Sequence, residues 1–394
     1  MNFATNVRTL FALRFCSGLV PAYVIERLYW EERGMTIQMV VYTEIIFALT
    51  VVLLEVPTGI LADRWGRKKM LVLSAALACC EFAILLAATE FWHFALVVFL
   101  AGISRSAGSG SENALLYDSL KLQGKAASFE KQLGRLNACD FGAAMIAALC
   151  GSLLADRFGL ELNYWISLGS ALLAMIFSTL LVEPARTDAE NDADDETIPF
   201  KRYVTASLRF FRTNPGVSLV VSSGMVTGAA IGFVDEFWQL YANRLDIPVA
   251  GFGVLSAALM LLRLPGNVLA HALLGRFGSR TLLVGAMTAI AAGFACSAAS
   301  QDFAGLAALL VVCLVSGIME PLASGYLHHR IDSSMRATID SFQSLGLNAV
   351  HILAGVGFGY FSARYDVFGG YGFIALLCGA FLVCLVAVSR KIER

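Results

Sequence analysis

The stretch Glu55–Leu73, EVPTGILADRWGRKKMLVL, carries five charged residues within seven positions between two apolar runs. These residues are Asp63, Arg64, Arg67, Lys68 and Lys69. Long apolar runs fit the bilayer interior, whereas basic residues collect in the short loops on one side of it. The stretch therefore predicts a loop between two membrane-spanning helices.

The composition of the whole chain agrees with this prediction. The 394 residues are 58% hydrophobic and only 15% charged, with a mean hydropathy of +0.70. Soluble domains carry about 25% charged residues, so a soluble globular protein is excluded. Runs of about twenty apolar residues each suffice for one spanning helix. Twelve spans are predicted, near 8–28, 37–61, 71–90, 93–120, 133–156, 161–183, 216–241, 249–274, 281–299, 302–325, 337–363 and 369–389.

The first apolar segment could be a signal peptide, and the cysteines could form a metal site or disulfides. The segment 8–28 contains Arg14, Glu26 and Arg27 and lacks a small-residue cleavage site, so we interpret it as a span and not a signal peptide. The nine cysteines all lie in predicted spans without paired C-x-x-C spacing. Neither a metal site nor a disulfide framework is predicted. We expect no cofactor and no nucleic-acid partner.

The distribution of basic residues predicts the orientation of the chain. With the N-terminus inside, the inner loops and termini receive 21 of the 29 Lys and Arg residues and the outer loops receive five. Basic residues are retained on the cytoplasmic side of a membrane. Both termini are therefore expected in the cytoplasm.

The chain divides near its middle into two similar halves. Residues 184–215 hold six acids within nine positions, followed by a basic run, which is typical of a solvated linker. Two sequence pairs recur at one offset of 212 residues: 61–71 with 273–283, and LGRLNA at 133–138 with LGLNA at 345–349. We therefore expect an N-terminal six-helix bundle (1–183), a cytoplasmic linker (184–215) and a C-terminal six-helix bundle (216–394), related as a duplication.

The string Gly59–Lys69, GILADRWGRKK, resembles the G-x-x-x-D-R-x-G-R-K/R signature of the major facilitator superfamily. The resemblance implies an all-α fold of twelve transmembrane helices in two parallel repeats, with a ligand cavity between them. In that family the loop joins the two halves at the cytoplasmic face when the outer side is open. The residues implied in this latch are Gly59, Asp63, Arg64, Gly66, Arg67 and Asp118.

The latch has two expected contacts. By analogy with the family, Asp63 meets the start of the eleventh span near Arg336, where a helix N-terminus favours negative charge. Arg67 is expected to pair with Asp118 at the end of the fourth span. The second copy of the signature has Gly275 in place of Asp63, so one half alone keeps the full motif.

The fourth span carries a second resemblance to the same family. It has Arg105 at mid-span followed by Gly108 and Gly110, similar to the motif R-x-x-x-G-x-G whose arginine is associated with proton coupling. The string ALLYDSL after it resembles a bacterial, efflux-like subgroup. The fifth span, 140–159, lacks the Gly-Pro motif of many drug/proton antiporters. The sequence therefore supports a transporter but does not decide whether it is an antiporter. Arg105 and Glu112 lie two turns apart on one helix and cannot touch directly. We therefore expect Arg105 to hold a ligand anion or a carboxylate, which is either Glu112 through water or an acid on the first or second span such as Glu44.

Charged residues inside spans are candidates for the substrate and proton pathway, because each costs about 2.5–3.5 kcal/mol at the bilayer centre. The adjacent acids in VDEFWQLY repel each other when both are charged, which makes them a candidate proton carrier. Glu81 is set aside because the third span is peripheral in this family. The candidates are Arg14, Glu44, Arg105, Glu112, Asp140, Asp235, Glu236, Trp238, Arg263 and Glu320.

The function expected from these features is secondary active transport of a small organic molecule across a bacterial inner membrane. Proton-coupled export is the first hypothesis. Proton-coupled uptake of a metabolite or siderophore-like compound is the alternative. A membrane enzyme or a non-transporting receptor is the third class, and no nucleophile–base pair supports an enzyme. The expected partners are the substrate and the lipid bilayer, with the protein acting as a monomer.

Overall fold

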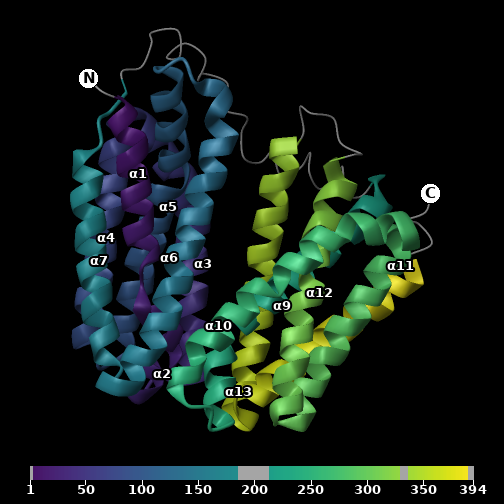
Figure 1. The fold of residues 1–394 in the computed structure, drawn as a ribbon. Coiled ribbons are helices and arrows are strands. Elements are labelled where there is room, and N and C mark those ends of the chain that lie inside the picture. Colours follow the sequence, from purple (N-terminus) through teal and green to yellow (C-terminus); the bar gives the residue numbers. More distant parts are fainter. Residues whose placement is uncertain (1–2, 185–212, 329–335, 389–394) are drawn as a thin grey trace. The chain divides into compact units, whose positions relative to one another are not determined.

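The computed structural model describes residues 3–184, 213–328 and 336–388, and the regular secondary structure in these residues is helical (Figure 1). The chain forms two compact units. Unit 1 comprises the described residues of Met1–Ala193 together with Ile247–Ala257, and unit 2 those of Asp194–Asp246 and Ala258–Arg394.

Unit 1 is built from long helices joined by short turns. In chain order these are α1 (Phe3–Gly18), η1 (Pro21–Ile25), α2 (Glu26–Glu32), α3 (Ile37–Trp65), α4 (Arg67–Ala87), α5 (Phe91–Lys121), η2 (Ala126–Ser128), α6 (Phe129–Phe158) and α7 (Glu161–Leu180). The turns use local chemistry. The Thr36 hydroxyl accepts a 3.2 Å hydrogen bond from the Met39 amide at the start of α3. Gly66, with φ of 111°, ends α3 in a conformation that suits glycine.

Unit 2 contains longer, broken helices. They are α9 (Pro215–Arg244), α11 (Arg263–Ser300), α12 (Phe303–His328) and α13 (Arg336–Val388), while η4 (Val249–Gly251) and the first part of α10 (Phe252–Leu261) belong to unit 1. The helix α11 bends at Gly278, and α13 is interrupted at Tyr365 and Asp366. Each break lies where the sequence predicted a loop between spans.

Eleven helices of the described residues are long and apolar enough to cross a membrane. The last of them, Leu345–Val388, has 44 residues and includes the interruption of α13. The interruption divides it into residues 345–364 and 367–388, each about as long as the roughly twenty residues that one span needs. The bounds of the predicted spans agree closely with the helices, but the number twelve remains a prediction.

Glycines allow the helices of unit 2 to approach closely. On α9, Gly228 and Gly232 face Leu347 and His351 of α13, and a Cβ at either glycine would lie within 3 Å of these side chains. Because 228 and 232 are one turn apart, as are 347 and 351, the two helices mesh in register. His351 stacks flat on Phe233 with ring centroids 4.6 Å apart. His351 is therefore a packing residue of this interface.

Candidate functional site

The charged loop of the opening stretch forms an ion pair inside unit 1. Arg67 begins α4 directly after Gly66, and its guanidinium pairs with the Asp118 carboxylate of α5. It also donates a 3.2 Å hydrogen bond to the Ala114 carbonyl. The predicted Arg67–Asp118 contact is confirmed. Gly59, Asp63 and Arg64 lie on the exposed side of the last two turns of α3.

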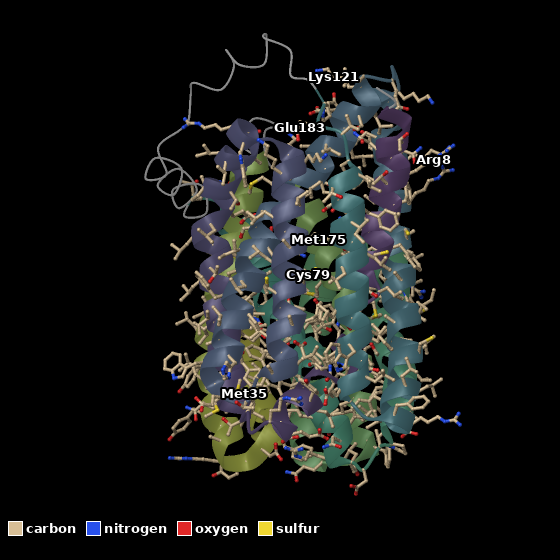
Figure 2. The ribbon with its side chains drawn as sticks, turned by 90° about the vertical axis from the view of Figure 1, so that its left-hand side faces the viewer. Arg8, Met35, Cys79, Lys121, Met175 and Glu183 are labelled. Atoms are coloured by element: carbon tan, nitrogen blue, oxygen red, sulfur yellow. The ribbon has the colours of Figure 1, made fainter. Side chains whose placement is uncertain are left out.

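Glu183, which follows α7, caps the start of α4. Its two carboxylate oxygens accept hydrogen bonds from the backbone amides of Arg67, at 2.9 Å, and of Lys68, at 2.6 Å. A carboxylate is favourable at a helix N-terminus, where amides lack partners. Asn6 holds the preceding residue in place, because its side-chain amide bonds both the N–H and the C=O of Val182. Glu183, labelled in Figure 2, is therefore a fixed support of the loop.

Replacing Glu183 with glutamine should loosen the start of α4. Glutamine can accept at one amide but loses the charge, so we expect a cost of about 1 kcal/mol, typical of a lost cap. Hydrogen exchange should quicken about fivefold at the Arg67 and Lys68 amides. Glu130→Gln, at an exposed position in the first turn of α6, is the matched control and should change neither amide. Unchanged exchange in Glu183→Gln would show that the cap does not stabilise this loop.

A second charge site of unit 1 lies deeper in the bundle. The Arg14 Nε of α1 donates a 2.9 Å hydrogen bond to Glu112 of α5, and its Nη1 lies 3.9 Å from the Asp140 carboxylate of α6. Glu112 is 8% exposed. Leu13 and Leu116 pack in the apolar cluster beside it. One guanidinium is thus shared by two carboxylates from different helices, in a largely apolar setting.

Gly18 sets the distance between α1 and α6 at this site. A Cβ at Gly18 would lie 2.7 Å from the Asp140 carboxylate oxygen and 3.2 Å from the Ala143 methyl group. Since Gly18 follows Arg14 by one helical turn, both residues face Asp140. The missing side chain lets Asp140 approach Arg14.

The expected partners of Arg105 are held by other arginines. Glu112 pairs with Arg14, and Glu44 accepts a 2.7 Å hydrogen bond from Arg27. Arg105 is exposed, and within the described parts of the chain it makes no ion pair. The reason is geometric: Arg105 and Glu112 lie two turns apart on one helix, about 10 Å along the axis, whereas α1 packs directly against α5.

Unit 2 joins two of the predicted residues that sequence reasoning had left separate. Both terminal nitrogens of Arg263 bind the Asp235 carboxylate, Nη1 at 3.2 Å from Oδ2 and Nη2 closer to Oδ1. Arg263 also lies 4.0 Å from the Cys313 sulfur of α12. It is the first residue of α11, directly after the break at Leu262. A bidentate ion pair therefore links α9 to the broken helix.

The remaining candidates of unit 2 are placed as follows. Glu236 is half-buried next to Asp235, and Trp238 is buried at 5% exposure. The side chain of Glu320 lies outside the described residues, as do those at the start of α13. The expected meeting of Asp63 with that helix therefore stays a prediction.

Three further contacts were missed by sequence reasoning. They are the Glu183 cap, the Arg27–Glu44 pair and the Arg244–Asp366 pair, in which Arg244 Nε lies 2.5 Å from the carboxylate. An acid at the end of the predicted sixth span (161–183) was a usable signal for Glu183, because the free amides of a neighbouring helix start need acceptors. The other two join residues 17 and 122 positions apart, and no spacing rule connects them.

Comparisons with known proteins place the chain in a family. The sequence model of the Major Facilitator Superfamily matches residues 9–239, more than half of the chain. The multidrug resistance protein MdtG of Citrobacter koseri is 25% identical over 406 residues, covering 96% of this chain and 92% of that protein. MdtG of Escherichia coli is also 25% identical, over 93% of this chain and 86% of that protein.

Solved structures share the fold. The nucleoside transporter NupG superposes with a TM-score of 0.77 at 13% identity, covering 98% of this chain and 99% of that one. The transporter PepTSo of the POT family gives 0.70 at 12% identity, with coverages of 99% and 98%. At such identities the likeness concerns the fold alone. From the sequence match and the charged signature together, the chain belongs to the Major Facilitator Superfamily and is a multi-pass membrane transporter.

Proposed function

We propose that this transporter exports a small organic molecule across a bacterial inner membrane in exchange for protons. In this proposal it works as a monomer with twelve spans, as two six-helix halves with both termini in the cytoplasm. Alternating access between the halves moves the substrate. The relatives named multidrug resistance protein support export, at 25% identity over most of the chain.

The observation that carries the proposal is the sharing of Arg14 between Glu112 and Asp140. When both acids are charged, the site has one negative charge in excess, in an environment where uncompensated charge is costly. A proton or a cationic group of the substrate can remove that excess. Because a proton and a cationic substrate would neutralise the same excess charge, they would compete for the site. Such competition is what exchange of protons for substrate requires.

Unit 2 offers a related arrangement. Arg263 neutralises Asp235, and the adjacent Glu236 adds a further carboxylate. Glu236 and Asp235 repel each other when both are charged. We assign Asp235 and Glu236 to proton coupling, together with the Arg14 site of unit 1. Arg105, exposed and mid-span, is assigned to contact with the substrate.

The loop around Arg67 is assigned to gating. The Arg67–Asp118 ion pair and the Glu183 cap hold the start of α4 in place. They therefore also restrict the position of Asp63, four residues before Arg67 at the end of α3. Asp63 would then bind the start of α13 only when the cytoplasmic side is closed.

The proposal predicts proton movement linked to substrate. Compounds are first selected by the thermal stabilisation they give to purified protein at two pH values. Added to everted vesicles with a preformed pH gradient, such a compound should release the gradient. The double variant Asp235→Asn/Glu236→Gln should weaken this release at least tenfold, because it removes both carboxylates. Asp156→Asn, at an exposed position in α6, should leave it unchanged.

Two outcomes would contradict the proposal. Transport that depended on sodium and not on pH would exclude proton coupling. Accumulation of the same compound by whole cells through this protein would exclude export and favour uptake.

A further inference from the structure

Arg105 is a mid-span arginine that has no acidic partner in the described parts of the chain. It lies near the middle of α5, about 21 Å from Phe91 at one end and about 24 Å from Lys121 at the other. Its side chain is exposed, and among the described residues it forms neither an ion pair nor a hydrogen bond. A guanidinium does not lose its proton in a protein, so the charge is permanent and requires water or an anion beside it.

The two acids that the sequence offered as partners of Arg105 are engaged by other arginines. Glu112 accepts a 2.9 Å hydrogen bond from Arg14, and Glu44 accepts a 2.7 Å hydrogen bond from Arg27. Both bonds join a guanidinium to a carboxylate, which is the stronger class of hydrogen bond. The sequence left open whether Arg105 holds a carboxylate of the chain or an anion of a ligand. With both acids engaged, the structure favours the ligand.

The face of α5 that carries Arg105 is turned toward α1. Arg105 and Glu112 are separated by two helical turns, so both lie on one face of the helix. On that face Glu112 contacts Arg14 of α1, and α1 packs directly against α5. A charged side chain in contact with lipid at this depth is costly. Arg105 therefore lies on the inner side of unit 1, where a solute that enters the bundle can reach its exposed side chain.

The residues on both sides of Arg105 hold its backbone to two neighbouring helices. The Ser104 hydroxyl donates a 2.9 Å hydrogen bond to the Ser74 carbonyl of α4, and the Ser74 hydroxyl donates one of 2.9 Å to the Ser104 carbonyl. On the other side, the Thr58 hydroxyl of α3 lies 3.0 Å from the Ser106 carbonyl. The backbone at Arg105 is thus fixed, while its guanidinium is not committed to another residue. A group on a rigid element suits ligand binding, because its position is set before the ligand arrives.

We propose that Arg105 binds an oxyanion group of the substrate, a carboxylate or a phosphate-type group. This inference rests on the proposed function in taking Arg105 as a substrate contact. The planar guanidinium can donate two parallel hydrogen bonds to such a group, whereas an ammonium group would be repelled and a neutral group would leave the charge unpaired. Glu112 lies about 10 Å away along α5. An anion at Arg105 and a proton at the Arg14 site can therefore be bound at the same time.

Chemical modification of arginines in the purified full-length protein tests this site before the substrate is known. Phenylglyoxal reacts with accessible guanidinium groups, and mass spectrometry measures the reaction of each arginine. At constant ionic strength, phenylacetate and benzylphosphonate should slow the modification of Arg105 about fivefold when most sites are occupied. Phenylacetamide and 2-phenylethylammonium carry the same ring without a negative charge, so they should not protect it. Arg135, exposed on α6, is the matched control and should react equally with all of these compounds present.

Two variants separate binding from folding. Arg105→Gln removes no contact between the described residues, so it should melt at the wild-type temperature but lose the thermal stabilisation given by phenylacetate. Arg105→Lys keeps the charge without the fork and should retain a smaller stabilisation.

Three results would overturn the anion site: protection of Arg105 by the neutral and cationic compounds as well as by the anions, no protection by the anions, or a lower melting temperature of Arg105→Gln without ligand. Sodium-dependent transport or cellular uptake would contradict the proposed function and leave the anion site unaffected, because the modification experiment uses no gradient.

Discussion

Replacing Arg14 with methionine is expected to destabilise the protein by about 3 kcal/mol and to abolish transport. The substitution replaces the aliphatic part of the side chain but leaves Glu112, at 8% exposure, without its guanidinium partner. Breaking a buried ion pair from one side costs about 3–5 kcal/mol, because the remaining charge stays buried. The lower end applies here, since the Arg14 side chain is 28% exposed. Thermal unfolding in detergent and the vesicle assay measure the two effects.

The double variant Arg14→Met/Glu112→Met separates stability from function. With both charges gone, stability should return to within about 1 kcal/mol of wild type, because apolar replacements of buried ion pairs are often neutral. Transport should stay absent, since the site no longer responds to protons. Arg8→Gln, at an exposed position on the same helix, is the control and should be normal in both assays. A double variant that transported as wild type would remove this ion pair from the mechanism.

Replacing Gly317 with leucine is the second change for which we expect a large effect. A Cβ at Gly317 would overlap the backbone of Arg263, and Gly266 faces Gly317 across the same contact between α11 and α12. Overpacking costs about 1–3 kcal/mol, and we expect the upper end because the obstacle is backbone. The helices should separate, which would pull Arg263 from Asp235 and expose the fully buried Cys313.

Thiol labelling of Cys313, followed by mass spectrometry, measures that separation directly. Labelling should rise in Gly317→Leu together with a lower melting temperature. Gly285→Leu on α11 is the matched control, because a Cβ there meets nothing within 4 Å. Wild-type melting and an unlabelled Cys313 in Gly317→Leu would show that the close contact is not required.

The sequence predicted contacts where a local pattern defined them. The signature around Gly66 led to the Arg67–Asp118 pair, which the structure contains. Reasoning from one face of one helix offered Glu112, through water, as a partner of Arg105, with Glu44 as the alternative. In the structure Arg14 takes that acid, since α1 packs beside α5 and presents its side chain at hydrogen-bonding distance. Spacing along one helix therefore did not identify the partner.

By itself, the sequence determined the membrane class, the positions of the helices and the family signature. These follow from local properties: apolar run length, the bounds set by loops, and a motif of adjacent residues. The tertiary structure alone decided which charges meet, namely Arg14 with Glu112 and Asp140, Arg27 with Glu44, and Asp235 with Arg263. Each of these pairs joins different helices, and glycines such as Gly18 set how closely two of those helices approach. Charge pairing inside a membrane depends on distances between helices, which no local pattern encodes.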